Sequence, residues 1–410
     1  MNEMPLENPF IPFALPCIGD EEIEAVVATM KSGWLTTGPK TRDFEQGFAK
    51  AVGASHALAT NSATGGLHLA LEAAGIGPDD LVLTPTWTFT ATAEVTRYLG
   101  GHPTFVDIEA DTLNISSAQL ERRIVELKRS HGAKLKAIVP VHFGGQACEM
   151  DAILALAEAH NLMVIEDAAH AFPTTAVSRS TNDMEKRKRE IGAIGHATVF
   201  SFYATKTIAT GEGGMVTTED ARIAERIRLM RLHGISRDVW NRYASTKPSW
   251  HYEVIAPGYK YNLTDIASAI GLVQLGKAQL FQRRREAIAS QYHAAFETHP
   301  ALEIPQQRHI YNTHAWHLYV LRLNLERLYI DRERFIDEMA LRGVGCSVHF
   351  IPLHLQPYWR DRYQLDPALF PIATREFQRV LSLPIYPSMD NDSVERVIYA
   401  VLEISELFAR

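Results

Sequence analysis

Short apolar runs alternate with amphipathic helical stretches from about residue 41 to residue 235. The runs contain few polar positions, which is typical of strands buried on both faces of a sheet. The alternation predicts a largely parallel sheet with helices on both faces, an α/β fold. The expected strands are LVLTP, PTFVDI, KAIVPVH, LMVIED and TVFSF, and the expected helices include AQLERRIVELKRS and MDAILALAEAH.

Two further regions flank this alternation. At the N-terminus, Asp20 is placed to cap the helical run EEIEAVVATMKS, which Gly33 ends. Past residue 263 a long helical stretch runs to about residue 298, and a mixed segment with strand-like HLYVLRLN and CSVHFIPL follows. We therefore expect an arm and helix over residues 1–35, a large domain over 36–265 and a small C-terminal α/β domain over 266–410. The first part is expected to pack with the third.

The segment from residue 177 to residue 190 breaks the pattern. It is polar and ends in the charged run EKRKRE. A solvated surface flap is the simplest interpretation. A contact at a subunit edge or with a substrate phosphate stays open as the alternative.

Composition limits the class of protein. Of 410 residues, 46% are hydrophobic and 22% charged, which is ordinary for a globular chain, and the net charge is −7. An acidic balance gives no indication of binding to nucleic acid or to a membrane. The sequence shows neither a signal peptide nor an apolar stretch of the roughly 18 residues that a membrane span needs. The three widely spaced cysteines form no disulfide framework and no metal-binding CxxC pair, so we expect a cytoplasmic protein.

The first candidate for chemistry is Lys206, in VFSFYATKTIATGEGGM. It follows an expected buried strand and precedes three glycines, Gly211, Gly213 and Gly214. Desolvation lowers the pKa of a lysine, and a neutral amine can form a Schiff base. Taken alone, Lys206 is better interpreted as a surface lysine. The glycines do not form a Walker phosphate loop, because no GK[ST] follows them.

The second candidate is the acidic end of the strand in LMVIEDAAHA, where Asp167 is followed by His170. In open α/β sheets, ligands bind beyond the carboxyl ends of the strands, and this places Asp167 at a ligand crevice. The alternative for Asp167 is a cap on the next helix.

The third candidate is TNSATGGLHLALEAAG, in which Asn61, Ser62 and Thr64 precede the small Gly65 and Gly66, after which we expect a helix to begin. The first N–H groups of a helix are unpaired and attract a phosphate. An ordinary capped helix is the alternative.

The fourth candidate is the aromatic pair Trp87 and Phe89 in TPTWTFTATAE, just after an expected strand. One of them is placed to stack on a flat ring, and the alternative is that both belong to the core. A lysine amine, a carboxylate, an anion site and a stacking aromatic are together the parts of a pyridoxal phosphate site. Asp167 and Lys206 stand 39 residues apart in this order.

These motifs resemble the DegT–StrS family of nucleotide-sugar aminotransferases over nearly the whole chain. The combination of IEDAAHA with FSFYATK is highly specific, and GWLTTGPKTRDFE, SATGGLHLAL, PVHFGGQ, PGYKYNLTDIASAIG and SVHFIPLH add to it. The resemblance implies the fold-type I aspartate aminotransferase architecture. This has a mainly parallel sheet of the seven-stranded type, here in a large domain that binds pyridoxal 5'-phosphate, and a smaller α/β C-terminal domain.

The resemblance also implies roles for single residues. Lys206 matches the Schiff-base lysine, Asp167 the partner of the pyridine nitrogen and His170 the position beside the ring. The phosphate turn reads SATGG where relatives more often have Gly–Thr–small–Ala, yet Gly65 and Gly66 still permit a close approach of the backbone. The remaining assignments are Phe89 to ring stacking, Ala63, Thr64 and Gly65 to the phosphate turn, and Ser201 to the hydroxyl that joins it.

Further implied roles concern a second subunit and the substrate. The stretch GYKYN matches a segment that reaches the neighbouring site in relatives, so Asn262 and Lys260 are candidates for the partner's cofactor phosphate in a homodimer with shared sites. Trp87, His349 and His354 are candidates for substrate binding, and a structural role stays open for the two histidines. The charged run ending at Arg189 replaces what is often a shorter hairpin.

The implied reaction is a ping-pong transamination. L-Glutamate would convert the cofactor to pyridoxamine 5'-phosphate, which would then aminate a keto group of a nucleotide-linked deoxysugar with Lys206 as general acid/base. The motif form favours C4 of the sugar over C3. A C3 aminotransferase or a sugar dehydratase is the alternative, although the C3 dehydratases have His where this chain has Lys206. A non-enzymatic PLP-binding regulator is disfavoured because we find no DNA-binding segment. The sugar, its position and the nucleotide (UDP, GDP or dTDP) stay undetermined.

Overall fold

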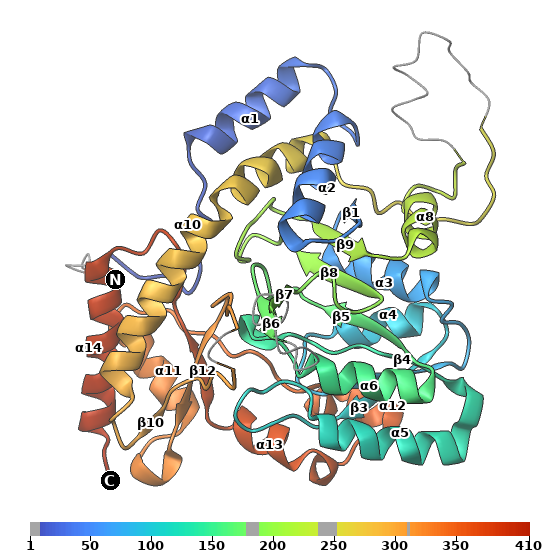
Figure 1. Ribbon diagram of the computed structural model, residues 1–410. Coiled ribbons are helices and arrows are strands. Elements are labelled where there is room, and N and C mark those ends of the chain that lie inside the picture. Colours follow the sequence, from blue (N-terminus) through green and yellow to red (C-terminus); the bar gives the residue numbers. More distant parts are fainter. Residues whose placement is uncertain (1–8, 178–187, 237–251, 310–311) are drawn as a thin grey trace.

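Seven strands form the central sheet of the protein, in the order β1-β9-β8-β5-β4-β2-β3 (Figure 1). Six of them run parallel, and β9 is antiparallel to both of its neighbours. The computed structural model describes residues 9–177, 188–236, 252–309 and 312–410. The predicted mainly parallel sheet is confirmed. The strands are β1 (His56–Thr60), β2 (Leu81–Pro85), β3 (His102–Val106), β4 (Leu135–Ile138), β5 (Met163–Asp167), β8 (Ala197–Ser201) and β9 (Gly214–Thr218).

Helices cover both faces of this sheet, which explains why its strands read as continuous apolar runs. Because side chains alternate along a strand, Ile165 points into the cluster under α3 and α8 while Val164 points into the one under α5 and α6. The helices of this domain are α2 (Pro39–Val52), α3 (Ala63–Ala73), α4 (Ala91–Tyr98), α5 (Ser117–His131), α6 (Met150–His160) and α8 (Ala221–Met230).

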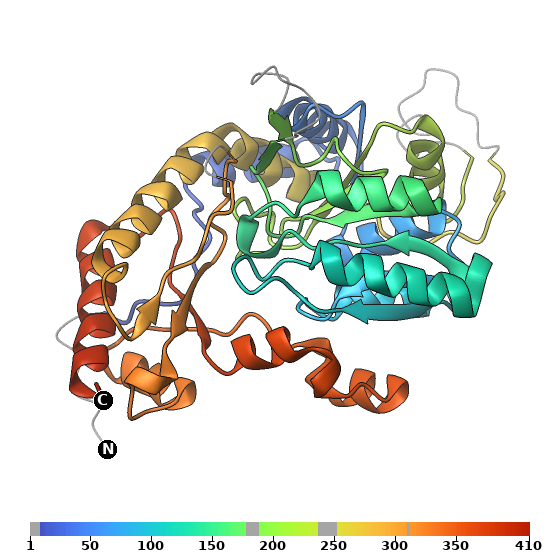
Figure 2. The same cartoon turned by 60° about the horizontal axis from the view of Figure 1, so that its bottom comes forward.

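The C-terminal part forms a smaller α/β unit on a three-stranded antiparallel sheet, in the order β10-β11-β12. Tyr292, Phe335 and Val397 from three helices pack on this sheet. Two short helices, α12 and α13, leave the unit and lie along the large domain, where Trp359 and Phe370 join a cluster with Phe105 (Figure 2). The elements are α10 (Asp265–Phe296), β10 (Leu302–Glu303), β11 (Tyr319–Leu323), α11 (Arg332–Leu341), α12 (Pro357–Tyr363), α13 (Pro371–Phe377), β12 (Val380–Leu383) and α14 (Asn391–Leu407).

Helix α10 serves both domains. Near its start, Gly271 lies so close to the ring of Phe44 on α2 that a Cβ would approach ring carbons to 2.7 Å. Toward its end, Tyr292 and Phe296 belong to the core of the small domain. The expected boundary at residue 265 thus falls at the start of the helix, but the helix packs with the large domain for part of its length.

The N-terminal helix α1 (Asp20–Lys31) rests on α10. Its buried Glu22 accepts hydrogen bonds from Lys277 Nζ at 2.9 Å and from Gln274 Nε2 at 2.8 Å. The N-cap is Gly19 and not the expected Asp20, because Glu22 turns back to accept the Gly19 N–H at 2.9 Å.

Two expected elements need correction or restriction. The strand expected at CSVHFIPL is wrong: this segment makes one isolated bridge, between Ser347 and Ser382, and then leaves the sheet. Pro352 lacks an N–H for a ladder, and the chain instead runs on to the large domain. The polar segment 177–190 begins and ends in a two-stranded antiparallel ladder of β6 (Thr175–Val177) and β7 (Lys188–Glu190), while residues 178–187 lie outside the described residues.

Among the described residues, none of the helices combines the length and the apolar character that crossing a membrane requires. The carboxyl edge of the large sheet faces the segment that enters from the small domain. The strand ends at this edge position the candidate site.

Candidate active site

A cavity of about 370 Å³ lies beyond the carboxyl ends of β5 and β8, between the start of α3 and the segment around residue 350. This is the position at which open α/β sheets bind ligands. The cavity brings together residues from segments that are far apart in the sequence. Eight of the expected residues line it: Ala63, Thr64, Phe89, Asp167, His170, Ser201, Lys206 and His349.

Lys206 lies on the turn that follows β8. The turn is held by its own backbone, since the Lys206 N–H donates to the Tyr203 carbonyl oxygen at 2.9 Å. Burial lowers the pKa of the amine to about 8, although the attraction of Asp167 opposes the shift. A substantial fraction of the amine is therefore neutral near pH 8, as a nucleophile or a proton carrier requires.

Asp167 is the last residue of β5 and is 5% exposed. The hydroxyl of Thr92 donates to its Oδ2 at 2.7 Å and the Ala169 N–H to its Oδ1 at 3.1 Å. Burial raises the pKa of this carboxyl, while Thr92 and Lys206 counteract the rise. Turns and not a helix follow it, so the alternative of a helix cap is wrong. Its geometry suits a carboxylate that pairs with a protonated ring nitrogen.

The start of α3 has the features of an anion site. Ser62 caps the helix by accepting the Gly65 N–H at 3.0 Å, which leaves the N–H groups of Ala63 and Thr64 at the cavity. The turn sits against β9, where a Cβ on Gly214 would lie 2.7 Å from the Ser62 carbonyl oxygen. Together with Ser201, which pairs with Gly214 and also lines the cavity, this turn fits a phosphate group.

The residues present therefore fit pyridoxal phosphate. An amine, a buried carboxylate and an anion-binding helix start face one cavity, and His170 and the half-exposed ring of Phe89 stand on its walls. The departure from the usual phosphate turn causes no conflict, because glycine is required at residue 66: a Cβ added there would lie 2.8 Å from Val199 Cγ1.

Two residues that we expected at the substrate lie elsewhere. Trp87 is fully buried and packs edge-on against Phe143, at 6.1 Å between ring centroids. His354 is also fully buried, and its two ring nitrogens hydrogen-bond the hydroxyls of Thr86 at 2.8 Å and Thr374 at 2.9 Å. Neither residue lines the cavity. The hydrogen bonds of His354 join the large domain to the C-terminal segment, whereas Trp87 is part of a hydrophobic core cluster.

His349, in contrast, reaches the cavity. Its Nδ1 hydrogen-bonds Ser382 Oγ at 3.0 Å, and its ring stacks on Phe13. Burial and the nearby Lys206 lower its pKa to about 4, so it is neutral at physiological pH. Of the two histidines in VHFIPLH, the structure brings this one to the cavity.

The sequence reasoning missed three contributors: Thr92, His317 and Phe350. His170 stacks on Phe350 at 5.6 Å and lies 4.4 Å from the ring of His317, and its Nδ1 accepts the Gly144 N–H at 3.2 Å. Burial lowers the pKa of both His170 and His317. The apolar pattern at His317 predicts only a strand. Nothing in the neighbouring sequence indicates that this side chain contacts His170.

Lys260 and Asn262 do not line this cavity. Lys260 Nζ donates to Asn262 Oδ1 at 2.5 Å, and Asn262 Nδ2 donates to Thr37 Oγ1 at 2.6 Å. The segment is anchored beside the phosphate turn, where the Asn61 N–H donates to the Tyr261 carbonyl oxygen at 2.7 Å. Their contact with a second copy stays a prediction.

Residues 16–402 match the model of the DegT/DnrJ/EryC1/StrS aminotransferase family. The chain is similar to the spore coat polysaccharide biosynthesis protein SpsC of Bacillus subtilis, with 48% identity over 398 residues that cover 97% of each chain. A match over 97% of this chain extends over both the large domain and the small domain.

Solved structures give the same result. A sugar aminotransferase described as putative, Spr1654 from Streptococcus pneumoniae, has a TM-score of 0.85 and 30% identity, and the match covers 97% of this chain and 98–99% of that one in forms with PMP and with PLP. PseC from Helicobacter pylori, an aminotransferase involved in the biosynthesis of pseudoaminic acid, has a TM-score of 0.85 and 27% identity, over 97% of this chain and 100% of its own.

Proposed function

The chain belongs to the DegT/DnrJ/EryC1/StrS aminotransferase family of PLP-dependent sugar aminotransferases, and on this premise we propose its reaction. The protein transfers the amino group of L-glutamate to the C4 keto group of a nucleotide-linked deoxysugar. The observation that carries the proposal is that Lys206 and Asp167 line one cavity, together with residues at the start of α3.

Each cavity residue has a task toward the cofactor. Asp167 would hold the ring nitrogen in its protonated form, Ala63, Thr64 and Ser201 would bind the phosphate, and Phe89 would stack on the ring. Pyridoxal phosphate would supply an aldehyde and an electron-withdrawing ring. Lys206 Nζ would hold the cofactor in the resting enzyme, and during the reaction it would move the proton as general acid and base. Its pKa of about 8 suits both directions of this transfer.

The assignment of C4 rests on the motif around Lys206, and glutamate as donor rests on the family resemblance. The relative SpsC is named for spore coat polysaccharide biosynthesis, which supports a sugar destined for a surface polysaccharide.

The proposal includes a homodimer. Helix α1 carries three exposed apolar side chains at helical spacing on the side away from α10: Ile23 is 55% exposed, Val27 42% and Met30 58%. A contiguous apolar face of this kind is typical of a subunit contact. A second copy on this side would bring Lys260 and Asn262 of one subunit to the cofactor phosphate of the other.

The test combines spectroscopy with product analysis. The PLP-loaded protein is mixed with L-glutamate, and its visible absorbance is followed. A panel of 4-keto and 3-keto nucleotide sugars is then added, and mass spectrometry identifies the product. We expect the glutamate-dependent change and one amino sugar with the amine at C4. An amine at C3 would correct the position. Loss of a hydroxyl with retention of the keto group would replace transamination by dehydration.

A further inference from the structure

A buried pair of polar side chains, Glu166 and His142, lies behind the cofactor cavity. Side chains alternate along a strand, so Glu166 points away from the cavity that its neighbour Asp167 lines. Both side chains of the pair are fully buried, and His142 Nε2 donates to Glu166 Oε2 at 2.9 Å. Neither residue lines the cavity. Any effect of the pair on the cofactor must therefore pass through other residues.

Both carboxylate oxygens of Glu166 accept from donors that cannot reverse their role. Oε1 accepts the Gly195 N–H at 2.6 Å and the Thr198 hydroxyl at 2.7 Å. Oε2 accepts from the His142 ring, whose proton is on Nε2 because Nδ1 accepts the Cys148 N–H at 3.0 Å. An amide in place of the carboxylate would turn its NH₂ group against one of these donors. The contacts therefore require a carboxylate at residue 166 and fix the orientation of the imidazole.

His142 is also the backbone neighbour of Asp167. Its N–H donates to the Asp167 carbonyl oxygen at 3.0 Å, and the Asp167 N–H donates to the Pro140 carbonyl oxygen at 2.9 Å. The segment 140–142 thus holds Asp167 by both of its backbone polar groups. Because the His142 ring is fixed to Glu166, this segment cannot tilt against β5 without breaking a buried hydrogen bond, and the Asp167 side chain keeps its direction into the cavity.

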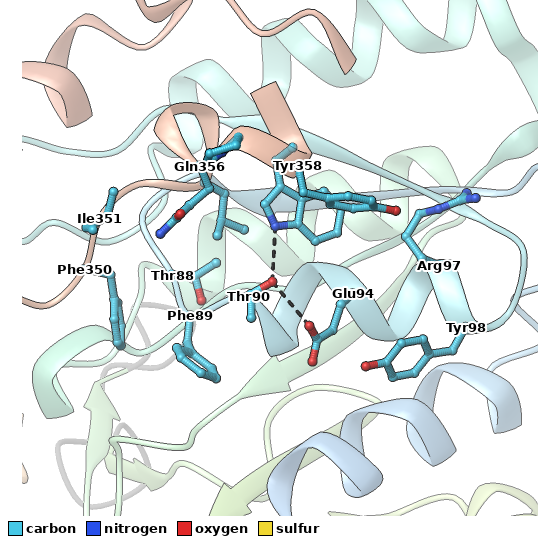
Figure 3. A pocket seen from close by; sticks show the side chains of 13 residues that line it. Thr88, Phe89, Thr90, Glu94, Arg97, Tyr98, Phe350, Ile351, Gln356 and Tyr358 are labelled. Carbon is cyan, nitrogen blue, oxygen red and sulfur yellow. Dashed lines mark hydrogen bonds between the residues drawn. The ribbon is translucent and has the colours of Figure 1, made fainter. Parts of the chain in front are cut away.

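The turn that follows His142 supports a second wall of the cavity. The Gly144 N–H donates to His170 Nδ1 at 3.2 Å, and the His170 ring stacks on Phe350 at 5.6 Å between centroids. Phe350 in turn lies 6.0 Å from the ring of Phe89, and Figure 3 shows these two side chains next to each other. The segment that the pair holds therefore supports both the residue for the ring nitrogen and the residue beside the ring.

We propose that Glu166 and His142 are positioning residues for the cofactor, which hold Asp167 at the angle at which its carboxylate meets the ring nitrogen. The inference rests on the role proposed above for Asp167. A pair that served the fold alone would change the stability of the protein when it is broken, but it would leave the protonation of a bound cofactor unchanged.

The test titrates the visible absorbance of the PLP-loaded full-length protein with pH. In Glu166→Gln the midpoint should rise by about one pH unit, because a ring nitrogen that loses its positive charge no longer repels the proton at Lys206 Nζ. The maximal rate of the glutamate-dependent absorbance change should fall roughly 10- to 100-fold, as for a misplaced reacting group, while the glutamate concentration at half-maximal rate changes little.

Two variants of His142 each keep one of the two hydrogen bonds of the ring. In His142→Asn the amide oxygen can still accept the Cys148 N–H, but the side chain is too short to reach Glu166. In His142→Gln the amide can still donate to Glu166 and loses the contact with Cys148. We expect His142→Asn to shift the absorbance midpoint as Glu166→Gln does, and His142→Gln to stay close to the parent.

Asp107→Asn is the matched control for the loss of a buried carboxylate. Asp107 is 4% exposed, and its oxygens accept the N–H groups of Ile372 and Ala373 at 3.0 Å each. It does not line the cofactor cavity. The amide would again face a fixed donor, so the thermal midpoint should fall as in Glu166→Gln, while the absorbance midpoint and the Kd for PLP stay at the parent values.

The outcomes separate positioning from stability. If Glu166→Gln and His142→Asn lower the thermal midpoint and keep the absorbance midpoint of the parent, the pair serves the fold alone and the inference is wrong. If Glu166→Gln yields no folded protein, the contrast between His142→Asn and His142→Gln decides alone. The pH titration needs no amino donor, so the inference stands or falls independently of whether glutamate is the donor.

Discussion

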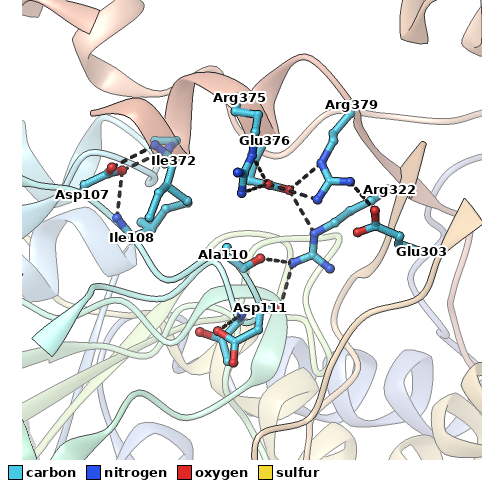
Figure 4. Close-up of polar contacts among 12 residues, drawn as sticks. Asp107, Ile108, Ala110, Asp111, Glu303, Arg322, Ile372, Arg375, Glu376 and Arg379 are labelled. Atoms are coloured by element: carbon cyan, nitrogen blue, oxygen red, sulfur yellow. Dashed lines mark hydrogen bonds and ion pairs between the residues drawn. The ribbon is translucent and has the colours of Figure 1, made fainter. Parts of the chain in front are cut away.

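Two regions of this protein bury charged groups, and they do so in opposite ways. At the junction of the domains, the carboxylate of Glu376 has no exposed surface and accepts hydrogen bonds from three arginines (Figure 4). Arg322 Nε lies at 3.2 Å, Arg379 Nε at 2.9 Å and Arg375 Nη2 at 2.8 Å. Arg322 also donates to the carbonyl oxygens of Ala110 at 3.0 Å and Asp111 at 2.8 Å, which ties the small domain to the large one.

The cofactor cavity instead leaves its charges incompletely paired. Within the part of the chain that the structure describes, we find no hydrogen bond to Lys206 Nζ, and burial lowers its pKa to about 8. A buried charge with every partner in place is a structural element, and removing one partner is costly. A buried charge without partners changes its protonation state readily and is available to a ligand. The number of partners, more than burial, separates the reactive site from the structural one.

The largest expected effect comes from Lys206→Met. Without the amine we expect the transaminase activity to fall more than about 10³-fold, since no other group on this wall can hold the cofactor and move the proton. The assay is product formation from glutamate and the keto sugar. Residual activity above about one tenth of the parent would contradict the role of Lys206.

The same variant should stabilise the cofactor-free protein. The pKa of Lys206 is about 8 in the folded chain and about 10.4 in the unfolded one, so the unfolded chain binds more protons between these values. The free energy of unfolding therefore rises with pH through this window, and at pH 7 the protonated Lys206 destabilises the folded chain to the full extent. Replacing the lysine by methionine removes this destabilisation and should raise the free energy of unfolding by about 1–3 kcal/mol in urea titrations. Lys277→Met, at a lysine paired with Glu22, is the matched control and should be destabilising.

Asp167→Asn tests the carboxylate of the same cavity. The amide has the same shape and can still bond Thr92, but it carries no charge to keep the ring nitrogen protonated. We expect the rate of the glutamate-dependent absorbance change to fall roughly 10²–10³-fold, with a thermal midpoint close to the parent's. A variant with an unchanged rate would show that the pairing of this carboxylate with the ring is not needed.

At the domain junction the expected effect is on stability. Glu376→Ala leaves the 4% exposed side chain of Arg322 without its carboxylate, at a cost of about 3–5 kcal/mol in unfolding free energy. Glu126→Ala, whose 64% exposed carboxylate pairs with the 38% exposed Arg123 at the surface, should cost less than about 1 kcal/mol. The folded fraction of either variant should keep its activity per molecule within a few-fold. Equal losses of stability would remove the contrast between paired and exposed carboxylates.

Sequence patterns predicted five of the seven strands of the central sheet, and they placed Lys206 and Asp167 in segments that the structure brings to one cavity. They also predicted a helix after Gly66, which begins three residues earlier, at Ala63. These features are local: an apolar run, a strand end and the residue just beyond it determine them. His317 and Phe350 could not be found in this way, because they come from segments more than a hundred residues from Lys206 and only the packing of the small domain brings them near.

The wrong predictions for Trp87 and His354 have a related cause. Trp87 and His354 stand in the right motifs, but whether a side chain faces a cavity or the core depends on which neighbouring segment covers it. Thr86, Thr374 and Phe143 cover these two residues. Likewise CSVHFIPL has the apolar pattern of a strand, but it pairs at Ser347 alone before the chain leaves the sheet.

The smallest expected effect is the pH dependence of cofactor loading. Its measurement tests directly whether Lys206 is unpaired. Only the neutral amine reacts with the aldehyde of free pyridoxal phosphate, so the rate of cofactor loading follows its fraction. With a pKa of about 8, the neutral fraction is about 10% at pH 7 and about 90% at pH 9. The loading rate of the cofactor-free protein should therefore rise roughly ninefold over this interval and level off above pH 9. His349, with a pKa of about 4, does not titrate in this range.

An amine that was paired like Lys277, whose pKa is raised, would instead give a loading rate that still climbs about tenfold per pH unit at pH 9–10. A continued climb would place Lys206 with the structural charges of the protein and abolish the distinction between the two regions.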